Sequence, residues 1–405
     1  MPTPYFFFRP VLTSRRSWLA LDWQPESPAE TDFASFVQCF VDSAAAPLAH
    51  VLPLISPISA EFVLQDRFLE AFKGESVTFV LPESCLANEA VIERCKELRA
   101  HARPLALQIE SPEALRRIPR AVFCAVRFDA AFARQDLSAQ DIDLLDDIDL
   151  KKIATRVNSH QMFEWLTRRG VQWSDGHFLT TPNPQLGKAP DLTRLKLLRL
   201  LSLIKQDDDT REIEAIFREE AQLSYNLLRL VNSVAISVRL KINSLSHAIA
   251  LLGRHQLQRW LQLLIYANNL TNSNAPSPLM QLAAARGRQM ELLSAAIDPI
   301  PDVPELTDSA FMTGLFSLLE VLINLPMSEI LKELPLQDTI IDALSNPAGG
   351  GVLGKLLSAI IASEAGDFAS AARLLSDLGI SPADHAKSQV TAFYWASRIN
   401  VDDRD

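Results

Sequence analysis

The hydrophobic pattern divides the chain into two halves of different character. In the first half, short apolar runs rich in β-branched residues occupy residues 77–81, 105–109 and 121–128. Helix-like stretches such as 88–102 separate them, and strands that alternate with helices in this way indicate a parallel sheet or barrel. From residue 192 onward, successive Leu- and Ala-rich runs have helical spacing. The predicted fold class is an α/β (TIM-like) barrel followed by an all-α domain.

A change of composition between the halves sets the predicted domain boundary. Residues 182–191 (PNPQLGKAPD) are rich in proline and glycine, which marks a loop or linker. We therefore expect one domain over residues 1–185 and a second over residues 186–405. Each is long enough to bury a hydrophobic core of its own.

An acidic run at residues 141–149 (DIDLLDDID) has two interpretations. Its aspartates suggest a calcium loop, but the run lacks the glycine and the final glutamate of an EF-hand. A solvated acidic helix is the favoured interpretation.

Composition and charge exclude some classes of protein. Hydrophobic residues make up 48% and charged residues 22% of the chain, as in ordinary globular proteins. The net charge of -10 argues against a general nucleic-acid surface, because phosphate binding needs a positive one. No uninterrupted apolar stretch approaches the roughly 18–20 residues of a membrane helix, and the N-terminal apolar run is too short for a signal peptide. We expect a cytoplasmic protein without a membrane span.

The four cysteines are Cys39, Cys85, Cys95 and Cys124, and none forms a C-x-x-C pair. They are interpreted as buried small hydrophobic residues in a reducing compartment, rather than as metal ligands or disulfides.

The most regular helical pattern lies at residues 226–266. Its leucines and valines recur at helical spacing, which predicts packed helices. Ser244 and Ser246 are suited to cap the helix that follows, and Gly253 to end it. The pattern predicts an all-helical domain and names no function.

The order of residues in this segment closely resembles the HDOD domain, a helical signalling domain related to metal-dependent HD phosphohydrolases but lacking their metal ligands. The resemblance rests on Val231-Asn232-Ser233, Ser244-Leu245-Ser246, Ala248-Ile249, Leu252-Gly253-Arg254 and Gln258-Arg259-Trp260. It extends over roughly residues 190–400 and includes the helix at 310–317. A short linking helix is expected in 325–336, with Ser328 as its N-cap. A helix pair broken at Gly366 is expected in 362–375. Gly314, in mid-helix, indicates close helix packing.

The HDOD segment offers polar residues but no predicted metal site. No His-Asp dipeptide occurs in the chain, and Asp384-His385, in the reverse order, is expected at the surface of a polar helix. His247 and His255 have no adjacent carboxylate and are interpreted as helix-surface or partly buried histidines hydrogen-bonded to backbone. The cluster Arg254, His255, Arg259 and Trp260 suits an anionic ligand. Alternatively, its arginines pair with Glu219 and Glu220 or lie in solvent while Trp260 packs in the core.

The first half contains a series of motifs in a fixed order. They are Arg9-Pro10-Val11, Trp18-Leu19-Ala20-Leu21, Phe163, Trp165, Leu166, Gly170, Gly176, Phe178 and Pro182. Over roughly residues 5–185 this frame resembles the EAL domain, the bacterial cyclic di-GMP phosphodiesterase barrel.

The residues that bind metal in the EAL family are not retained by this alignment. The family's ligand positions fall on Leu19, Val80, Gln108, Thr155, Asn158 and, for a glutamine, Asp175. Only Arg127-Phe128-Asp129 keeps the charge character of the corresponding strand. The resemblance therefore implies no metal site, no catalytic residues and no cofactor, because metal-activated water needs several ligands together.

Two functions fit this combination. A catalytically inactive bacterial regulator would act through protein partners in a cyclic di-GMP-linked pathway of motility, biofilm or virulence control. A nucleotide sensor would instead bind cyclic di-GMP without hydrolysing it, at Arg127, Asp129 and the barrel mouth. An enzyme would need an active centre that the sequence does not show.

Overall fold

The computed structural model describes residues 4–27, 30–74, 76–182, 259, 262, 277–299, 301, 303, 305–334 and 336–399. The chain forms two compact units. Unit 1 comprises Met1–Thr181 together with Ala359–Val390, and unit 2 comprises Pro182–Ser358 together with Thr391–Asp405. The segment at 226–266, apart from Arg259 and Gln262, lies outside the described residues, and the domain boundary at residue 185 stays a prediction.

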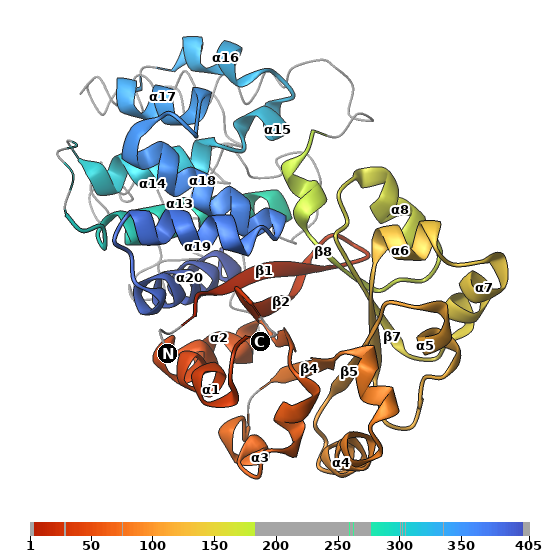
Figure 1. Ribbon diagram of the computed structural model, residues 1–405. Coiled ribbons are helices and arrows are strands. Elements are labelled where there is room, and N and C mark those ends of the chain that lie inside the picture. Colours follow the sequence, from red (N-terminus) through yellow and green to blue (C-terminus); the bar gives the residue numbers. More distant parts are fainter. Residues whose placement is uncertain are drawn as a thin grey trace, which may run out of the picture. The chain divides into compact units, whose positions relative to one another are not determined.

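Unit 1 contains a closed barrel of eight strands in sequence order (Figure 1). The strands are β1 (Phe6–Thr13), β2 (Trp18–Pro25), β3 (Leu54–Pro57), β4 (Val77–Leu81), β5 (Leu105–Ile109), β6 (Ala125–Asp129), β7 (Lys151–Thr155) and β8 (Trp173–Asp175). β1 pairs antiparallel with both β2 and β8, whereas the other pairs are parallel. The predicted barrel is confirmed, and β4 and β5 lie where the apolar runs placed them.

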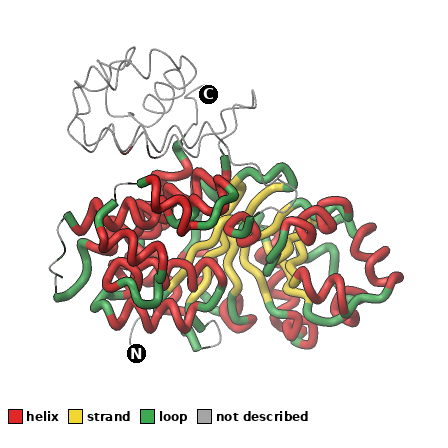
Figure 2. The backbone as a smooth tube through the Cα atoms, turned by 90° about the horizontal axis from the view of Figure 1, so that it is seen from above, coloured by secondary structure: helices red, strands yellow, loops and turns green. Residues whose placement is uncertain are grey.

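Short helices connect the strands and lie outside the barrel (Figure 2). They are α1 (Phe33–Asp42), α2 (Ala45–Val51), η1 (Ala60–Leu64), α3 (Phe68–Ala71), η2 (Glu83–Ala87), α4 (Glu89–Ala100), α5 (Pro112–Arg116), α6 (Ala130–Gln135), α7 (Ala139–Asp147), α8 (His160–Arg168) and η3 (His177–Thr180). Polar side chains accept backbone N–H bonds at several helix starts, as Asn88 does for α4 and Ser159 for α8.

The acidic run forms helix α7, but its first aspartate is not solvated. Asp141 is buried and forms a capping box with Ser138. It also accepts two hydrogen bonds from Arg116, at 2.9 and 3.0 Å. The helix was therefore predicted correctly, whereas the solvated position was wrong for Asp141.

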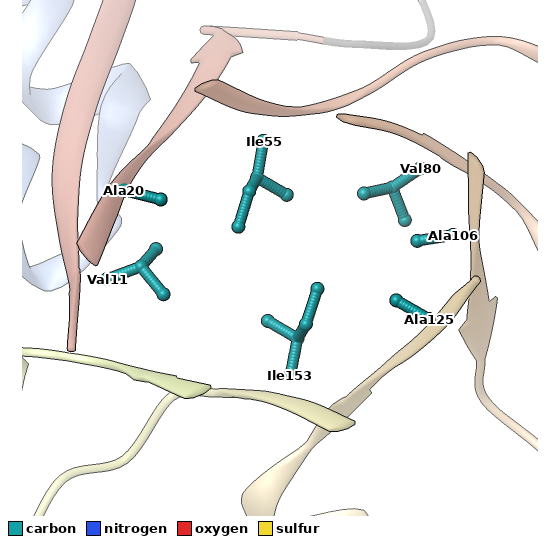
Figure 3. Close-up of a cluster of buried hydrophobic side chains, with 7 residues drawn as sticks. All are labelled: Val11, Ala20, Ile55, Val80, Ala106, Ala125 and Ile153. Carbon is teal, nitrogen blue, oxygen red and sulfur yellow. The ribbon is translucent and has the colours of Figure 1, made fainter. Parts of the chain in front are cut away.

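One layer of small and branched side chains fills the middle of the barrel (Figure 3). It consists of Val11, Ala20, Ile55, Val80, Ala106, Ala125 and Ile153, all buried. Side chains alternate between the two faces of a strand, so residues two positions away share this inward face. This layer fixes which side chains of each strand point toward the mouth of the barrel.

The outward face of β1 and β2 is covered by aromatic packing. Phe6 and Trp23 stack with ring centroids 5.0 Å apart, and Trp23 meets Phe36 of α1 at 4.7 Å. All three rings are buried. This packing leaves Phe7 and Arg9, with the opposite alternation, on the inward face of β1.

The inward face at the start of β1 packs against a helical segment from the far end of the chain. This segment, called the C-terminal arm below, is Ala359–Val390 and belongs to unit 1. It includes the end of α18 (Gly351–Ala365), all of α19 (Phe368–Asp377) and the start of α20 (Pro382–Ser397). The predicted break at Gly366 is confirmed, because its φ of +84° separates α18 from α19.

His385 in the arm corrects a prediction. It was expected at the surface, but its side chain is only 1% exposed. Its ring packs against Phe7 at 5.1 Å and against Tyr5 at 5.8 Å between centroids. The polar neighbours of His385 along the chain misled the prediction, because the contact comes from β1.

Unit 2 is helical in its described part. Its helices are α13 (Pro278–Ser294), α14 (Leu306–Phe316), α15 (Leu319–Ile323), α16 (Met327–Ile330), η4 (Leu331–Glu333) and α17 (Asp338–Ser345). Pro326, and not Ser328, is the N-cap of α16, so the predicted cap was wrong. The close packing predicted at Gly314 is confirmed, because a Cβ there would lie 2.8 Å from the carbonyl oxygen of Arg286 and from the Cα of Gly287.

Replacing Gly314 with alanine is expected to destabilise unit 2 by about 1–3 kcal/mol, because the obstructing atoms are backbone and cannot swing aside. In an unobstructed helix the same change would stabilise by about 1 kcal/mol. Urea unfolding followed by amide exchange of α13 and α14 measures the effect. Gly287→Ala, whose nearest atom would be 3.0 Å away, should cost less, and a stabilising Gly314→Ala would contradict the contact.

One stretch of unit 2 is long and apolar enough to cross a membrane by length and composition. Leu306–Ile323 has a mean hydropathy of 1.5 over 18 residues, and 56% of it is buried inside the protein. The stretch is divided into α14 and α15, and α14 packs against α13 through Gly314. Its apolar character is accounted for by its place in the core of unit 2.

Candidate functional site

Four charged side chains lie together toward the mouth of the barrel. The register pairs Arg9 with Asp22, and each is two residues from a member of the central layer on its own strand. Arg127 is likewise two residues beyond Ala125. Because β1 is antiparallel to its neighbours, its first half lies at the carboxyl ends of the parallel strands, where barrel enzymes place their sites.

Asp22 is the centre of this group, which we call the mouth cluster: Arg9, Asp22, Arg127 and Asp175. The Asp22 carboxylate accepts a hydrogen bond of 2.7 Å from Arg9 Nη2. Arg127 Nη2 donates to both Asp22 oxygens, at 3.0 and 2.9 Å. Gln24 Nε2 adds a fourth bond of 3.0 Å. The carboxylate is therefore saturated by donors from three strands.

All four members of the cluster are buried. The exposed fraction is 8% for Arg9, 3% for Asp22, 6% for Arg127 and 4% for Asp175. Burial lowers the pKa of Arg127, with Asp22 opposing and the charge of Arg9 assisting that shift. Burial also acts to lower the pKa of Arg9, but Asp22 and Asp175 outweigh it, so this pKa is raised. The cluster holds two positive groups around one shared carboxylate.

Asp175 is bonded to the backbone of the loop that follows β7. Its oxygens accept the backbone N–H of Arg156 at 2.5 Å and of Val157 at 3.0 Å, and so fix the turn after β7. Arg156 has a left-handed φ of 54° in that turn. Burial raises the pKa of Asp175, and Arg9 opposes the shift. This side chain stabilises a loop at the mouth.

Asp129 lies at the rim of the barrel. It accepts backbone N–H bonds at the start of α6, from Ala131 at 2.6 Å and Phe132 at 3.4 Å. Its other oxygen is bonded to Arg156, whose side chain is 71% exposed. Arg127 and Asp129, the pair singled out from the sequence, thus have different partners.

The other positions aligned to family ligands are spread over different surroundings. Val80 belongs to the central apolar layer, and Leu19 packs against that layer beside the bulge between β1 and β2. Thr155 donates to the Phe128 carbonyl at 3.2 Å, and Asn158 is exposed. Gln108 is half-buried in β5. The structure gathers none of these five into a polar constellation.

Asp22 is the functional candidate that the sequence reasoning passed over. The pairing of β1 with β2 places it inside the barrel opposite Arg9, two positions beyond the inward-facing Ala20. The available signal was the alternation of β2, since Ala20 and Asp22 share one face.

The mouth cluster does not fit a divalent metal. A divalent metal such as Mg²⁺ or Ca²⁺ needs several oxygen ligands, but both oxygens of Asp22 are already bonded to guanidinium groups. Two buried arginine charges would also repel a cation at that point. Within the residues that the structure describes, no group of three His, Cys, Asp or Glu side chains is placed to hold a metal.

A cavity of about 830 Å³ lies beside the mouth, between the loops that follow β4 and β5. Glu83, Glu110 and Glu113 line it together with Arg117 and apolar side chains. Glu83 Oε2 accepts the backbone N–H of Glu110 at 2.8 Å and of Ser111 at 3.0 Å. This acidic lining disfavours an anionic ligand.

In the helical region, the predicted anion cluster is described only at Arg259. Its Nη2 donates to Glu291 at 2.7 Å and to Asp308 at 2.8 Å, and its guanidinium lies over the Phe311 ring. Arg259 therefore pairs with carboxylates of α13 and α14. Arg254, His255, Trp260, His247, Glu219 and Glu220 lie outside the described residues.

The cysteines lie in unit 1 as free thiols, three buried and Cys124 half-buried. Burial raises the pKa of Cys39 and Cys95 to about 12 and of Cys85 to about 11. Protonated thiols of this kind are poor metal ligands and nucleophiles.

Comparison with known proteins finds a known domain in the second half of the chain. Residues 193–334 match the HDOD domain. The chain therefore carries an eight-stranded barrel and, after it, a segment that matches the HDOD domain. The resemblance that extended to about residue 400 stays a prediction beyond residue 334.

Two relatives match across both parts. Cyclic di-GMP phosphodiesterase CdgJ of Vibrio cholerae serotype O1 is 23% identical over 370 residues, which cover 90% of this chain and 79% of that protein. The uncharacterized protein YuxH of Bacillus subtilis is 24% identical over 306 residues, which cover 68% of each chain.

Solved EAL structures are similar to part of the chain. The EAL domain of Mycobacterium smegmatis DcpA is 16% identical, with a TM-score of 0.35, over 45% of this chain and 92% of that one. The FimX EAL domain from Pseudomonas aeruginosa bound to c-di-GMP is 15% identical, with a TM-score of 0.32, over 45% and 91%. The EAL-like domain protein YdiV is 11% identical, with a TM-score of 0.33, over 43% and 90%.

Proposed function

We propose that this protein is a catalytically inactive bacterial signalling regulator that acts through protein partners in a cyclic di-GMP-linked pathway in the cytoplasm. The observation that carries the proposal is the saturation of Asp22 by Arg9 and Arg127. The relation to the phosphodiesterase CdgJ supports the link to cyclic di-GMP signalling. The HDOD domain supports a role in signalling.

The chemistry follows from the charges at the mouth. A metal-dependent phosphodiesterase needs carboxylates free to hold cations that activate water. Asp22 accepts bonds from two buried guanidinium groups, and Asp175 accepts two backbone N–H groups. To bind a cation, Asp22 would have to release both arginines and leave their charges buried and unpaired. The cluster therefore favours a fixed barrel over a hydrolytic centre.

A nucleotide sensor is the second candidate, and Arg156 favours it. Its side chain is 71% exposed at the mouth, and an arginine fork suits a phosphate. Binding there would compete with Asp129, the carboxylate that Arg156 contacts. This reading keeps the barrel inactive but gives it a ligand.

A turnover assay tests the proposal. Purified protein at high micromolar concentration with Mn²⁺ or Mg²⁺ is expected to hydrolyse cyclic di-GMP no faster than buffer, because the mouth cluster offers no free ligand set. CdgJ under the same conditions is the positive control. Hydrolysis that a chelator abolishes, and that Asp22→Asn removes, would refute the inactive barrel.

Calorimetry separates the two candidates. A partner-binding regulator should show no heat with cyclic di-GMP in magnesium or calcium. Stoichiometric binding that Arg156→Gln weakens, while Arg168→Gln at an 81% exposed arginine of α8 does not, would establish the sensor instead. Cross-linking and pull-down from the native cell should then recover one specific partner for the regulator, in equal amount with and without nucleotide.

A further inference from the structure

The start of β1 is covered on its inward face by the C-terminal arm. Phe7 and Arg9 have the same alternation as Val11, which points into the barrel. Phe7 stacks on Phe368 of α19, with centroids 4.7 Å apart and an interplanar angle of 7°. Because β1 begins at the mouth of the barrel, the stack of Phe7 on Phe368 lies at that mouth.

Arg9 is held between the barrel and the arm. Its Nη2 donates to Asp22 at 2.7 Å, and its guanidinium carbon lies 5.4 Å from the centroid of the Phe368 ring. The corner between α18 and α19 approaches the same group, because a Cβ on Gly366 would lie 3.0 Å from Arg9 Nη1. One side chain thus contacts the central carboxylate of the mouth cluster and the first residue of α19.

Further contacts fix the arm along the same strand. The Tyr5 hydroxyl donates to the Ile380 carbonyl at 2.6 Å, and the Phe8 backbone N–H donates to Gln389 Oε1 at 3.2 Å. His385 packs between Tyr5 and Phe7. Residues at and just before the start of β1 therefore contact α19, the turn after it, and α20.

We propose that the α18–α19 corner is an intramolecular cap on the barrel mouth, latched through Arg9. A partner or ligand that takes hold of Asp22 or Arg9 from the mouth would break the latch and loosen the arm. Loosening the arm would in turn weaken the hold of Arg9 on Asp22. The cap is independent of the proposed function, since it would operate on an inactive barrel or on a nucleotide sensor alike.

Amide hydrogen exchange of the full-length protein tests the cap. Gly366→Ala is expected to speed exchange of the α19 amides about tenfold, because the new Cβ crowds Arg9 and adds backbone strain at positive φ. Gly74→Ala is the matched control, since Gly74 has the same φ of +84° with nothing within 4 Å. Equal acceleration of α19 by both variants would overturn the latch.

A second pair of variants tests transmission from the barrel interior. Asp22→Asn removes the charge that holds Arg9 and should also speed exchange in α19, about tenfold, although residue 22 lies in β2. Asp141→Asn breaks a different ion pair of unit 1 and should leave α19 unchanged. If the Asp22→Asn protein folds and its α19 amides exchange at the wild-type rate, the cap is refuted.

Phe368→Leu keeps the test decisive if Asp22→Asn does not fold. This change removes the ring over Arg9 and keeps an apolar side chain in contact with Phe7. We expect faster exchange at the β1 and β2 amides around Arg9 and Asp22, as well as in α19. An effect confined to α19 would show a packing contact without a latch, and would overturn the proposal.

Discussion

Replacing Asp22 with asparagine is expected to lower the free energy of unfolding of unit 1 by about 3–5 kcal/mol. The carboxylate neutralises Arg9 and Arg127, whose side chains are 10% and 7% exposed. Without it, two positive charges would stay in the barrel with no compensating charge from β2. Removing one partner of a buried ion pair is costly for this reason, even though the pair itself adds little.

Urea denaturation, followed by circular dichroism and by exchange of the β5 and β6 amides, would measure this loss. Glu93→Gln is the control, because Glu93 and its partner Lys96 are 60% and 54% exposed. That substitution should change stability by less than about 1 kcal/mol. A loss for Asp22→Asn no larger than for Glu93→Gln would show that the mouth cluster is solvated in solution.

Acidification below pH 6.5 is expected to destabilise unit 1 through His385. Burial lowers the pKa of this imidazole from 6.5 to about 3. In the unfolded chain, the His385 imidazole therefore becomes protonated below about pH 6.5. In the folded protein, it stays neutral until the pH falls to about 3. Above pH 6.5, His385 therefore does not lower the free energy of unfolding. Between pH 6.5 and about pH 3, that free energy falls by about 1.4 kcal/mol per pH unit.

The test compares unfolding free energies at pH 7.0 and pH 4.5 for the wild type and His385→Leu. The variant should lose about 2–3 kcal/mol less than the wild type over this interval. His101→Leu is the control, because His101 is exposed at the end of α4. Parallel pH profiles for wild type and His385→Leu would mean that the imidazole is hydrated in the folded protein.

The apolar strands β4 and β5 were predictable from sequence, whereas the shortest strands of the barrel were not. β4 and β5 are covered on both faces and read as continuous apolar runs, which is why their bounds were found. β3 and β8 are only four and three residues long and carry too little pattern to detect. The helices described in unit 2 were predictable from the spacing of leucine and alanine, because a helix as long as α13 repeats the apolar pattern several times.

The candidate site was harder to predict because it depends on register. The family alignment placed a ligand position at Leu19, beside the bulge between β1 and β2, whereas alternation from Ala20 places Asp22 inside the barrel. A bulge adds one residue to a strand, so the side chains beyond it change from one face to the other. The local sequence gives no clear signal of where a bulge occurs. Arg127 was singled out from the sequence, but its partner Asp22 is 105 residues away.

The contacts between β1 and the C-terminal arm also bear on the order of events during synthesis. β1 is synthesised before the other strands of the barrel, yet the inward side of Phe7 meets Phe368 and His385 only after the C-terminal arm has been synthesised. Until then, the strand that closes the barrel exposes an aromatic face that a chaperone or another nascent chain can bind. The contacts between β1 and the arm therefore form late in folding, after the strands of the barrel have been synthesised.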